Sequence, residues 1–491
     1  MKYIRITIIC MLVLLLSAAL LPTAAAEERA EDLTKRCSFD FGSYKSAEGR
    51  VLSDSTHYQI FQGGESFSLT WEEPLDGARL CLTWQDAPKD VSILQYDAEG
   101  TLLSADALPS FYETATPLLS DARKAVVQAG EAEMRVRFCA VYGAGALPEV
   151  FHDWQETPDH LDYLLISTHP DDDVLFLGSI IPTYGAEQGY VGTTVYVTKM
   201  RDENSGRIRV SEAENASWVL GLRYYPIFLN MPDVADSATQ EKKKLFKYNE
   251  LLVNIVRVYR QYHPLVVFAQ DIDGEYGHWQ HVLVSKASRE AFALAADPTF
   301  DPESAEQYGT WQVQKLFLHL FKKYELIVDA HAPLSFFGGK DAFEVACEAY
   351  EKHESQQRMW FKVGRDDYQY AFNRFGMAEG VVPVGKDVFD NIDETMLSSY
   401  VPPTPEPTAE PTPEPTAELT PEPTEQVQIT FDTPEPVPVP TDEPQTPVPE
   451  PQPTQMDPLP LILIGVITVA AAIAVGAAAF FWRKRHPADR D

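Results

Sequence analysis

The spacing of hydrophobic residues divides the chain into two folded parts with different patterns. From residue 27 to residue 152, apolar and polar residues alternate in short runs, such as Ser-Phe-Ser-Leu-Thr-Trp at residues 66–71, and Gly, Asp and Pro separate these runs. Alternation with a period of two is typical of half-buried strands. Many short strands joined by turns predict an all-β sandwich over residues 27–152.

From Asp162 onward the pattern changes to continuous apolar runs that alternate with helical segments. Three such runs lie at residues 163–168, 194–198 and 265–270. Strands of this kind, separated by helices, are typical of a parallel sheet that is buried on both faces. We therefore expect an α/β fold, a Rossmann-like parallel sheet with helices on both faces, over residues 153–395. Ligands of such sheets bind at the carboxyl ends of the strands.

Two further apolar segments predict the cellular location. Residues 1–26 combine an early positive charge, an apolar stretch and three closing alanines, which is the pattern of a signal peptide. Residues 458–482 are uncharged and long enough for one transmembrane helix. Residues 483–491 start with three basic residues, which favours a cytoplasmic tail. The sequence thus predicts a single-pass type I protein of the cell membrane whose folded domains are extracellular.

The amino-acid composition predicts a spacer between the folded part and the predicted membrane helix. Of the 37 prolines, 18 lie between residues 402 and 455, and that stretch also holds eleven acidic and no basic residues. Such a Pro-, Thr- and Glu-rich segment cannot bury a core, so residues 396–457 are predicted to be a disordered, extended stalk. The net charge of −33 argues against nucleic acid as a partner, because phosphate binding requires a basic surface.

The sequence pattern determines neither the disulfide pairing of the cysteines nor the oligomeric state. Five cysteines in 491 residues are too few for a disulfide scaffold. Four of them follow the predicted signal peptide: Cys37, Cys81, Cys139 and Cys347. A Cys81–Cys139 bridge and buried free thiols are both compatible with the pattern, since pairing cannot be deduced from spacing.

Candidate chemistry lies at the ends of two predicted strands. His169, Asp171, Asp172 and Asp173 directly follow the first apolar run, and the segment 273–281 follows the third one with two histidines three residues apart. Histidine and carboxylate side chains from two strand ends can bind one Zn²⁺ ion and leave a position for water, as in catalytic zinc sites.

These residues resemble a known family. His169-Pro170-Asp171-Asp172 is similar to the His-Pro-Asp-Asp signature of the PIG-L/LmbE-like zinc-dependent N-acetylglucosamine de-N-acetylases. Further family motifs follow in the same order over residues 160–360: Arg209-Val210-Ser211-Glu212, Leu229 to Asp233, Gly277-His278-Trp279-Gln280-His281 and His353-Glu354-Ser355-Gln356. The N-terminal part loosely resembles discoidin-like, galactose-binding-like sandwiches. Four of its aromatic residues are candidates for stacking on sugars or, alternatively, for filling the core or an interdomain face: Trp71, Trp84, Tyr96 and Phe111.

The family resemblance implies a role for each matching residue. His169, Asp172 and His281 would bind zinc, Asp171 would be the general base, and a protonated His278 would stabilise the oxyanion. Arg209 and Asp233 would contact sugar hydroxyls, or Arg209 would brace the loop through Glu212.

The chain departs from the family pattern in three places. Asp173 stands where the family usually has Glu, Trp279-Gln280 replaces Pro-Asp, and residues 199–207 replace the family's Gly-rich loop after the second strand. Trp279 would stack on substrate or, alternatively, pack at the start of a helix. The choice of substrate is therefore less determined by the sequence than the metal.

The sequence thus predicts a surface-anchored, zinc-dependent N-deacetylase, a hydrolase of linear amides. Its substrate would be an N-acetylglucosamine-type sugar in a glycan or glycoconjugate, with the exact acyl sugar open. The alternative is a cell-surface glycan-binding or adhesive protein with a degenerate deacetylase-like domain, which the stalk and the sandwich motivate.

Overall fold

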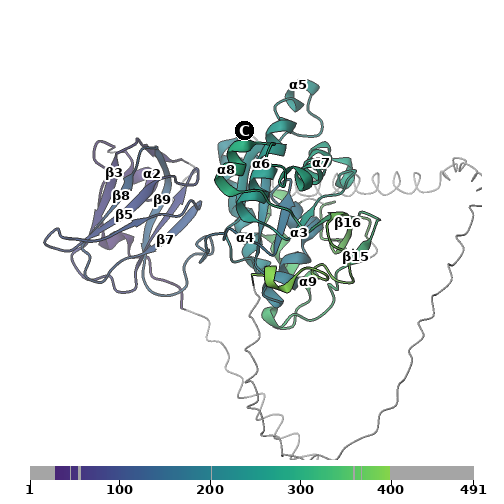
Figure 1. Ribbon diagram of the computed structural model, residues 1–491. Coiled ribbons are helices and arrows are strands. Elements are labelled where there is room, and N and C mark those ends of the chain that lie inside the picture. Colours follow the sequence, from purple (N-terminus) through teal and green to yellow (C-terminus); the bar gives the residue numbers. More distant parts are fainter. Residues whose placement is uncertain are drawn as a thin grey trace, which may run out of the picture. The chain divides into compact units, whose positions relative to one another are not determined.

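The computed structural model describes residues 28–398, except residues 45, 54–56, 201, 358–359 and 366–367 (Figure 1). All of them belong to the first of two compact units of the chain, Met1–Glu406. The predicted signal peptide, transmembrane helix and basic tail, and all but the first residues of the predicted stalk, lie outside the described residues. Within residues 28–398, no helix is long and apolar enough to cross a membrane.

The N-terminal domain is a sandwich of two antiparallel sheets, as the alternating pattern predicts. The strands pair in the orders β1-β3-β8-β5-β6 and β2-β9-β4-β7. Their bounds are β1 Ser38–Asp40, β2 Gln59–Phe61, β3 Ser66–Thr70, β4 Arg79–Trp84, β5 Val91–Tyr96, β6 Leu102–Ala107, β7 Glu113–Pro117, β8 Lys124–Ala129 and β9 Met134–Tyr142, and the short helices are η1 Thr34–Arg36 and α2 Glu48–Val51. Every second residue of β5 is buried, so one face of its sheet contributes to the core.

Most of the aromatic candidates for sugar stacking in this domain are covered. Trp71 and Trp84 lie in the sandwich core with exposed fractions of 5% and 0%. Phe111 stacks on Tyr225 of the second domain with ring centroids 4.0 Å apart. These three side chains therefore fill the core and the interdomain face, the second of the two predicted roles. All four described cysteines are free thiols, so a Cys81–Cys139 bridge is absent.

The second domain is built on a seven-stranded sheet with the order β12-β11-β10-β13-β14-β16-β15. The five strands from β12 to β14 are parallel, and β16 runs antiparallel to both of its neighbours. The strand bounds are β10 Tyr163–Ser167, β11 Gly192–Lys199, β12 Ile227–Pro232, β13 Val266–Ala269, β14 Lys315–His319, β15 Glu325–Ile327 and β16 Arg374–Gly380.

Helices cover both faces of this sheet (Figure 1). Their bounds are α3 Asp172–Leu177, η2 Ile181–Glu187, α4 Glu203–Val219, α5 Gln240–Lys243, α6 Tyr248–Tyr262, η3 Glu275–Gly277, α7 Trp279–Leu294, α8 Pro302–Tyr308, η4 Ser335–Phe337, α9 Ala342–Glu351, η5 Glu354–Gln356 and η6 Glu394–Met396. In β10, Tyr163 and Leu165 join the core beneath α3 and α9, whereas Leu164 and Ile166 join the core beneath α6 and α7. Burial on both faces confirms the predicted α/β arrangement and explains why these strands lack alternation.

The strand order reverses beside β10. The chain continues from β10 to β11 and β12 on one side, and then crosses to β13 and β14 on the other side. Loops that leave β10 and β13 at their carboxyl ends therefore diverge and leave a crevice between them, which is where ligands bind in doubly wound sheets. Both candidate motifs follow these two strands.

The two domains are joined by a buried polar contact. Arg207 of α4 donates to the backbone oxygen of Trp84 at 2.7 Å and pairs with the carboxylate of Glu113. The backbone N–H of Tyr112 donates to the hydroxyl of Tyr225 at 2.8 Å. The sandwich is thus fixed to the sheet domain by charge-assisted hydrogen bonds as well as by stacked rings.

Candidate active site

The loop after β10 presents the first set of candidate residues. β10 ends at Ser167, and α3 begins at Asp172, so the turn between strand and helix consists of the four residues from Thr168 to Asp171. Asp171 has a φ of 138°, a conformation that costs a non-glycine residue roughly 1–3 kcal/mol. The backbone N–H of His169 donates to Asp172 Oδ2 at 2.8 Å, which locks the loop around that carboxylate.

The loop after β13 presents the second set. β13 ends at Ala269, the chain makes the short η3 helix, and α7 starts at Trp279 with His278 as its N-cap. The Nδ1 atom of His278 accepts the backbone N–H of Gln280 at 3.3 Å, which satisfies one of the free donors at the helix start. His281 therefore lies in the first turn of α7 and is fully buried.

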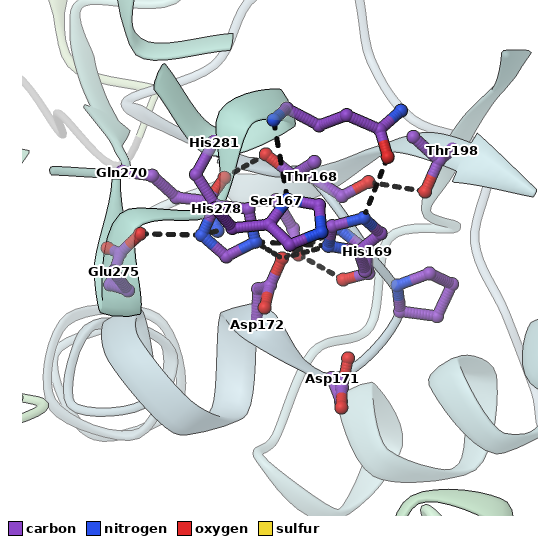
Figure 2. Close-up of polar contacts among 12 residues, drawn as sticks. Ser167, Thr168, His169, Asp171, Asp172, Thr198, Gln270, Glu275, His278 and His281 are labelled. Atoms are coloured by element: carbon purple, nitrogen blue, oxygen red, sulfur yellow. Dashed lines mark hydrogen bonds and ion pairs between the residues drawn. The ribbon is translucent and has the colours of Figure 1, made fainter. Parts of the chain in front are cut away.

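The three predicted metal ligands meet at one point (Figure 2). His169 Nδ1 lies 3.0 Å from Asp172 Oδ2 and 3.0 Å from His281 Nε2, and the third side, between His281 Nε2 and Asp172 Oδ2, is 3.1 Å. Zinc bonds of 2.0–2.1 Å in a tetrahedron place neighbouring ligand atoms about 3.3 Å apart. The triangle therefore has nearly the size of one face of a zinc coordination sphere.

A carboxylate behind His281 fixes which of its nitrogens faces this triangle. His281 Nδ1 lies 2.8 Å from Glu275 Oε2, and the other oxygen of Glu275 lies 2.7 Å from His319 Nδ1. All three side chains are completely buried. A hydrogen on Nδ1 of His281, donated to Glu275, leaves the lone pair of Nε2 free for a metal ion, the usual support of histidine ligands.

Gln280 supports His169 in a similar way. Its Oε1 atom lies 3.4 Å from His169 Nε2 and accepts the backbone N–H of Val234 at 3.1 Å, while its amide donates to the backbone oxygen of Pro232 at 3.0 Å. With its Nε2 hydrogen directed at Gln280, His169 presents the lone pair of Nδ1 to the triangle. The glutamine that departs from the family pattern thus orients a predicted ligand.

The electrostatic field of the site favours a cation. Although burial acts in the opposite direction, His281 and His169 hold the pKa of Asp172 well below its usual range. Burial lowers the pKa of His281, but Asp172 and Glu275 outweigh it and raise that pKa to about 10. A pocket that contains two ionised carboxylates and two imidazoles, and that draws positive charge so strongly, fits a divalent metal ion.

His278 lies beside the triangle and is not one of its three corners. The nitrogens of His169, His278 and His281 lie within 4.8 Å of one another, so these three histidines also form a group that can hold a metal. Burial, followed by the neighbouring His169 and His281, lowers the pKa of His278 to about 3. His278 is therefore neutral rather than protonated, and because its Nδ1 accepts from Gln280, its Nε2 carries the hydrogen and is a donor.

Asp171 points away from the triangle and is held by α4 (Figure 2). Arg209 Nη2 donates to Asp171 Oδ1 at 2.8 Å and also to the backbone oxygen of Pro170. Glu212 lies 3.9 Å from the guanidinium and accepts the backbone N–H and hydroxyl of Ser355 at 2.6 and 2.7 Å. Burial raises the pKa of Asp171 to about 6 although Arg209 opposes it.

The remaining predicted residues occupy different positions. Arg209 is 6% exposed and bound to the loop, so its position supports the bracing role rather than the predicted contact with sugar hydroxyls. Asp233 lies at the site, with Oδ1 3.7 Å from His169 Nε2 and a side chain that is 23% exposed. Trp279 packs edge-on against Phe246 at 5.6 Å and donates to the backbone oxygen of Val234, so it packs at the helix start.

Sequence reasoning missed three residues of the site: Glu275, Gln280 and His319. Glu275 sits in a charged, glycine-containing loop, where a solvent-exposed role would have been equally compatible with the sequence. His319 lies in an apolar run of the sequence, and its position at the carboxyl end of the parallel strand β14 was the available signal. Gln280 could have been found only from the register of α7, which directs residues 280 and 281 inward.

Comparison with known proteins identifies the domain. The family model PIG-L, GlcNAc-PI de-N-acetylase, matches residues 164–292. Among curated proteins, a 1D-myo-inositol 2-acetamido-2-deoxy-alpha-D-glucopyranoside deacetylase of Catenulispora acidiphila is 28% identical over 177 residues, which are 31% of this chain and 54% of that protein. The corresponding deacetylase of Streptomyces scabiei has the same identity and coverage. The chain thus spans about half the length of the curated relatives it matches.

Two solved structures are among those similar to parts of this chain. An N,N′-diacetylchitobiose deacetylase from Pyrococcus horikoshii is 23% identical with a TM-score of 0.33, over 43% of this chain and 76% of that one. A fucose-binding module of Streptococcus pneumoniae is 9% identical with a TM-score of 0.19, over 23% of this chain and 96% of that one. The match to the family model spans β10 to α7 and includes every corner of the ligand triangle, and residues 164–292 of this chain are a PIG-L domain.

Proposed function

We propose that the protein is a zinc-dependent de-N-acetylase that hydrolyses the acetamide of an N-acetylglucosamine-type sugar in a glycan or glycoconjugate. The observation that carries this proposal is the triangle of His169, Asp172 and His281, with sides of 3.0, 3.0 and 3.1 Å, inside a PIG-L domain. Two imidazole nitrogens and one carboxylate oxygen are a donor set that suits zinc.

The residues around the triangle can perform each proton transfer of amide hydrolysis. A bound zinc ion would supply a Lewis acid for the carbonyl and an acidified water. Asp171 takes a proton from the attacking water, whose oxygen forms a bond to the acetamide carbon. The Nε2–H of His278 donates to the carbonyl oxygen as negative charge develops there, a role that a neutral imidazole can fulfil.

The same residues complete the reaction. The C–N bond breaks as the carboxyl of Asp171 returns its proton to the departing nitrogen, so the products are acetate and a free amino sugar. Arg209 keeps Asp171 in place through the 2.8 Å contact and Glu212 holds the guanidinium from behind. Asp233, partly exposed beside His169, is placed to accept hydrogen bonds from sugar hydroxyls.

The proposed location follows from the sequence alone. The predicted signal peptide, the acidic proline-rich stalk and the predicted helix at residues 458–482 support a surface enzyme tethered by one C-terminal helix. Its catalytic domain would then act on extracellular or envelope glycans. Protease treatment of intact cells tests this: release of the folded domain by cleavage in the stalk is expected, and a protein that stays protected inside the cell would contradict it.

The chemistry is tested by measuring acetate release from N-acetylated amino sugars and their glycans by the purified protein. We expect activity that a chelator abolishes and that added Zn²⁺ restores, together with about one zinc per chain that His281→Ala protein lacks. Full activity of metal-free protein would refute the mechanism. Tight glycan binding without any acetate release would favour the alternative of an adhesive protein with a degenerate domain.

A further inference from the structure

An aromatic cavity of about 540 Å³ lies beside the candidate metal site. We call it the aromatic pocket. Six of its lining residues carry aromatic rings: Phe176, Tyr276, Trp360, Phe361, Tyr368 and Tyr370. Leu175, Lys362 and Gln369 complete the wall. Its volume lies within the range of about 300–1,000 Å³ that is usual for small-molecule sites.

The pocket borders the ligand triangle, because Tyr276 and Phe176 line the pocket and also lie next to the histidines of the site. The ring of Tyr276 lies 5.3 Å from that of His281 and 5.8 Å from that of His278, and on its other side it lies 5.7 Å from Phe361. Phe176, four residues after the ligand Asp172, has its ring centroid 6.1 Å from His281. A glycoside whose N-acetylated sugar is bound at the triangle would therefore have the aromatic pocket next to it.

The far wall comes from a segment outside the family match. Trp360, Phe361, Tyr368 and Tyr370 lie between α9 and β16, well beyond residue 292 where the match ends. Trp360 is 66% exposed, which is unusual for the largest apolar side chain, and Tyr276 is 42% exposed. Tyr276 also has a φ of 47°, a left-handed conformation that a tyrosine rarely adopts. Exposed rings held in this way are typical of a binding surface.

The side chains that line the aromatic pocket favour some classes of ligand over others. Within the described lining, no acidic side chain is present, and Lys362 is the one cation, with its Nζ 5.0 Å over the ring of Tyr368. A phosphate group would therefore find little compensating charge. A lipid chain would be expected to bind aliphatic side chains, but Leu175 is the one aliphatic residue of the lining. Flat rings with polar edges, such as three tyrosines and a tryptophan, instead match a ligand with apolar faces and hydroxyl edges.

We propose that the aromatic pocket binds a second, uncharged sugar ring that is glycosidically linked to the N-acetylated sugar. This inference rests on the proposed function and specifies its substrate class: oligosaccharides or polysaccharides are preferred over single sugars and over phosphate-bearing conjugates. The C–H face of the second ring stacks on the rings of the wall, and its hydroxyls reach Gln369 and the tyrosine hydroxyls.

Kinetics on matched substrates test the proposal. Acetate release is measured for N-acetylglucosamine, its β-1,4-linked dimer, its 1-phosphate and its octyl glycoside, with wild-type protein, Trp360→Ala and Tyr368→Ala. The control is Phe336→Ala, which removes an aromatic side chain of similar exposure, 51%, outside the pocket. We expect the dimer to be the best substrate, and Trp360→Ala to lower its kcat/KM about five- to tenfold, mainly through KM, because one stacked ring is lost. The control Phe336→Ala should hydrolyse both the dimer and the single sugar as the wild type does.

A binding measurement separates this proposal from the proposed function. Calorimetric titration of the dimer into metal-free protein needs no turnover, and it should show weaker binding to Trp360→Ala than to wild type and to Phe336→Ala. Equal dimer binding by all three proteins would overturn the sugar assignment. So would a kcat/KM for the octyl glycoside that exceeds that for the dimer in the wild type and no longer does so in Trp360→Ala. No acetate release from any compound, with dimer binding that still depends on Trp360, would refute the proposed function and leave the pocket assignment standing.

Discussion

Asp171 combines three features that suit a general base: a strained backbone, nearly complete burial and a single charged partner. Its φ of 138° directs the carboxylate away from the ligand triangle, where Arg209 holds it at 2.8 Å. A neighbouring aspartate, Asp172, has a different task because both histidine ligands surround it. Two adjacent carboxylates thus contact different groups because the turn points them in different directions.

Asp171→Asn separates catalysis from metal binding. Asparagine keeps the hydrogen bond to Arg209 but cannot take a proton, so kcat should fall by about 10²–10⁴-fold while the zinc content stays the same. Acetate release and metal analysis of the same preparation measure both quantities. Asp121→Asn, an exposed aspartate of the sandwich, is the matched control and should leave both unchanged. Loss of zinc in Asp171→Asn would instead make Asp171 a ligand.

Glu275 and His319 lie behind His281, one of the predicted ligands. Because Glu275 binds both imidazoles, at 2.8 and 2.7 Å, Glu275→Gln removes the charge that favours the correct tautomer of His281. The expected result is a zinc affinity that is lower by about 10–100-fold, measured by competition with a chromophoric chelator. Glu241→Gln, in a side chain that is 82% exposed, is the control. Unchanged affinity in a folded Glu275→Gln protein would contradict the supporting role.

At the scale of the elements, the site depends on where β10 and β13 lie in the sheet. The sequence was sufficient to predict the parallel sheet and to place His169, Asp172 and His281 together, because continuous apolar strands and ordered motifs are local signals. It could not show that Gln280 contacts His169 or that His319 binds the carboxylate of Glu275 behind His281. Those contacts depend on the register of α7 and on β14 lying beside β13, which are tertiary features.

The helix α4 connects the site to the short helix η5, which follows α9. Ser355 donates twice to Glu212, which lies beside Arg209, and Arg209 holds the loop after β10. Ser355→Ala removes the hydroxyl bond of 2.7 Å, and the expected cost is about 0.5–1.5 kcal/mol of stability. Since Glu212 then restrains Arg209 less, kcat should fall about two- to tenfold with KM for the sugar unchanged.

Steady-state kinetics and urea unfolding of the same protein check this prediction. Ser205→Ala is the control, because Ser205 also lies on α4 and its hydroxyl also bonds to a carboxylate, that of Asp202, away from the site. A Ser355→Ala enzyme with wild-type kcat and reduced stability would limit Ser355 to a structural role.

At the scale of the whole molecule, the opposite face of α4 carries the contact with the sandwich. Glu214 is 2% exposed, accepts a hydrogen bond from Tyr225, and lies near Arg207 and the carboxyl of Glu113. Burial, followed by the repulsion of Glu113, raises the pKa of Glu214 well above its usual range. One helix therefore holds the loop after β10 with Arg209 and contacts the sandwich with Arg207 and Glu214, two and five positions away.

This buried carboxyl gives the fold a defined pH dependence. Because the folded protein retains a proton on Glu214 at pH values where the unfolded chain has lost it, above about pH 4.3, the native state binds more protons and stability falls as pH rises. The contribution reaches up to about 1.4 kcal/mol per pH unit and ends above the raised pKa. Glu214→Gln mimics the protonated form and cannot ionise, so its unfolding free energy should decrease less between pH 5 and pH 8 than that of wild type.

Urea unfolding at several pH values measures this difference. The control is Glu303→Gln, because the side chain of Glu303 is 87% exposed. Parallel pH profiles for wild type and Glu214→Gln would show that Glu214 is ionised in the folded protein, and Arg207 would then have to neutralise both carboxylates of the interdomain contact.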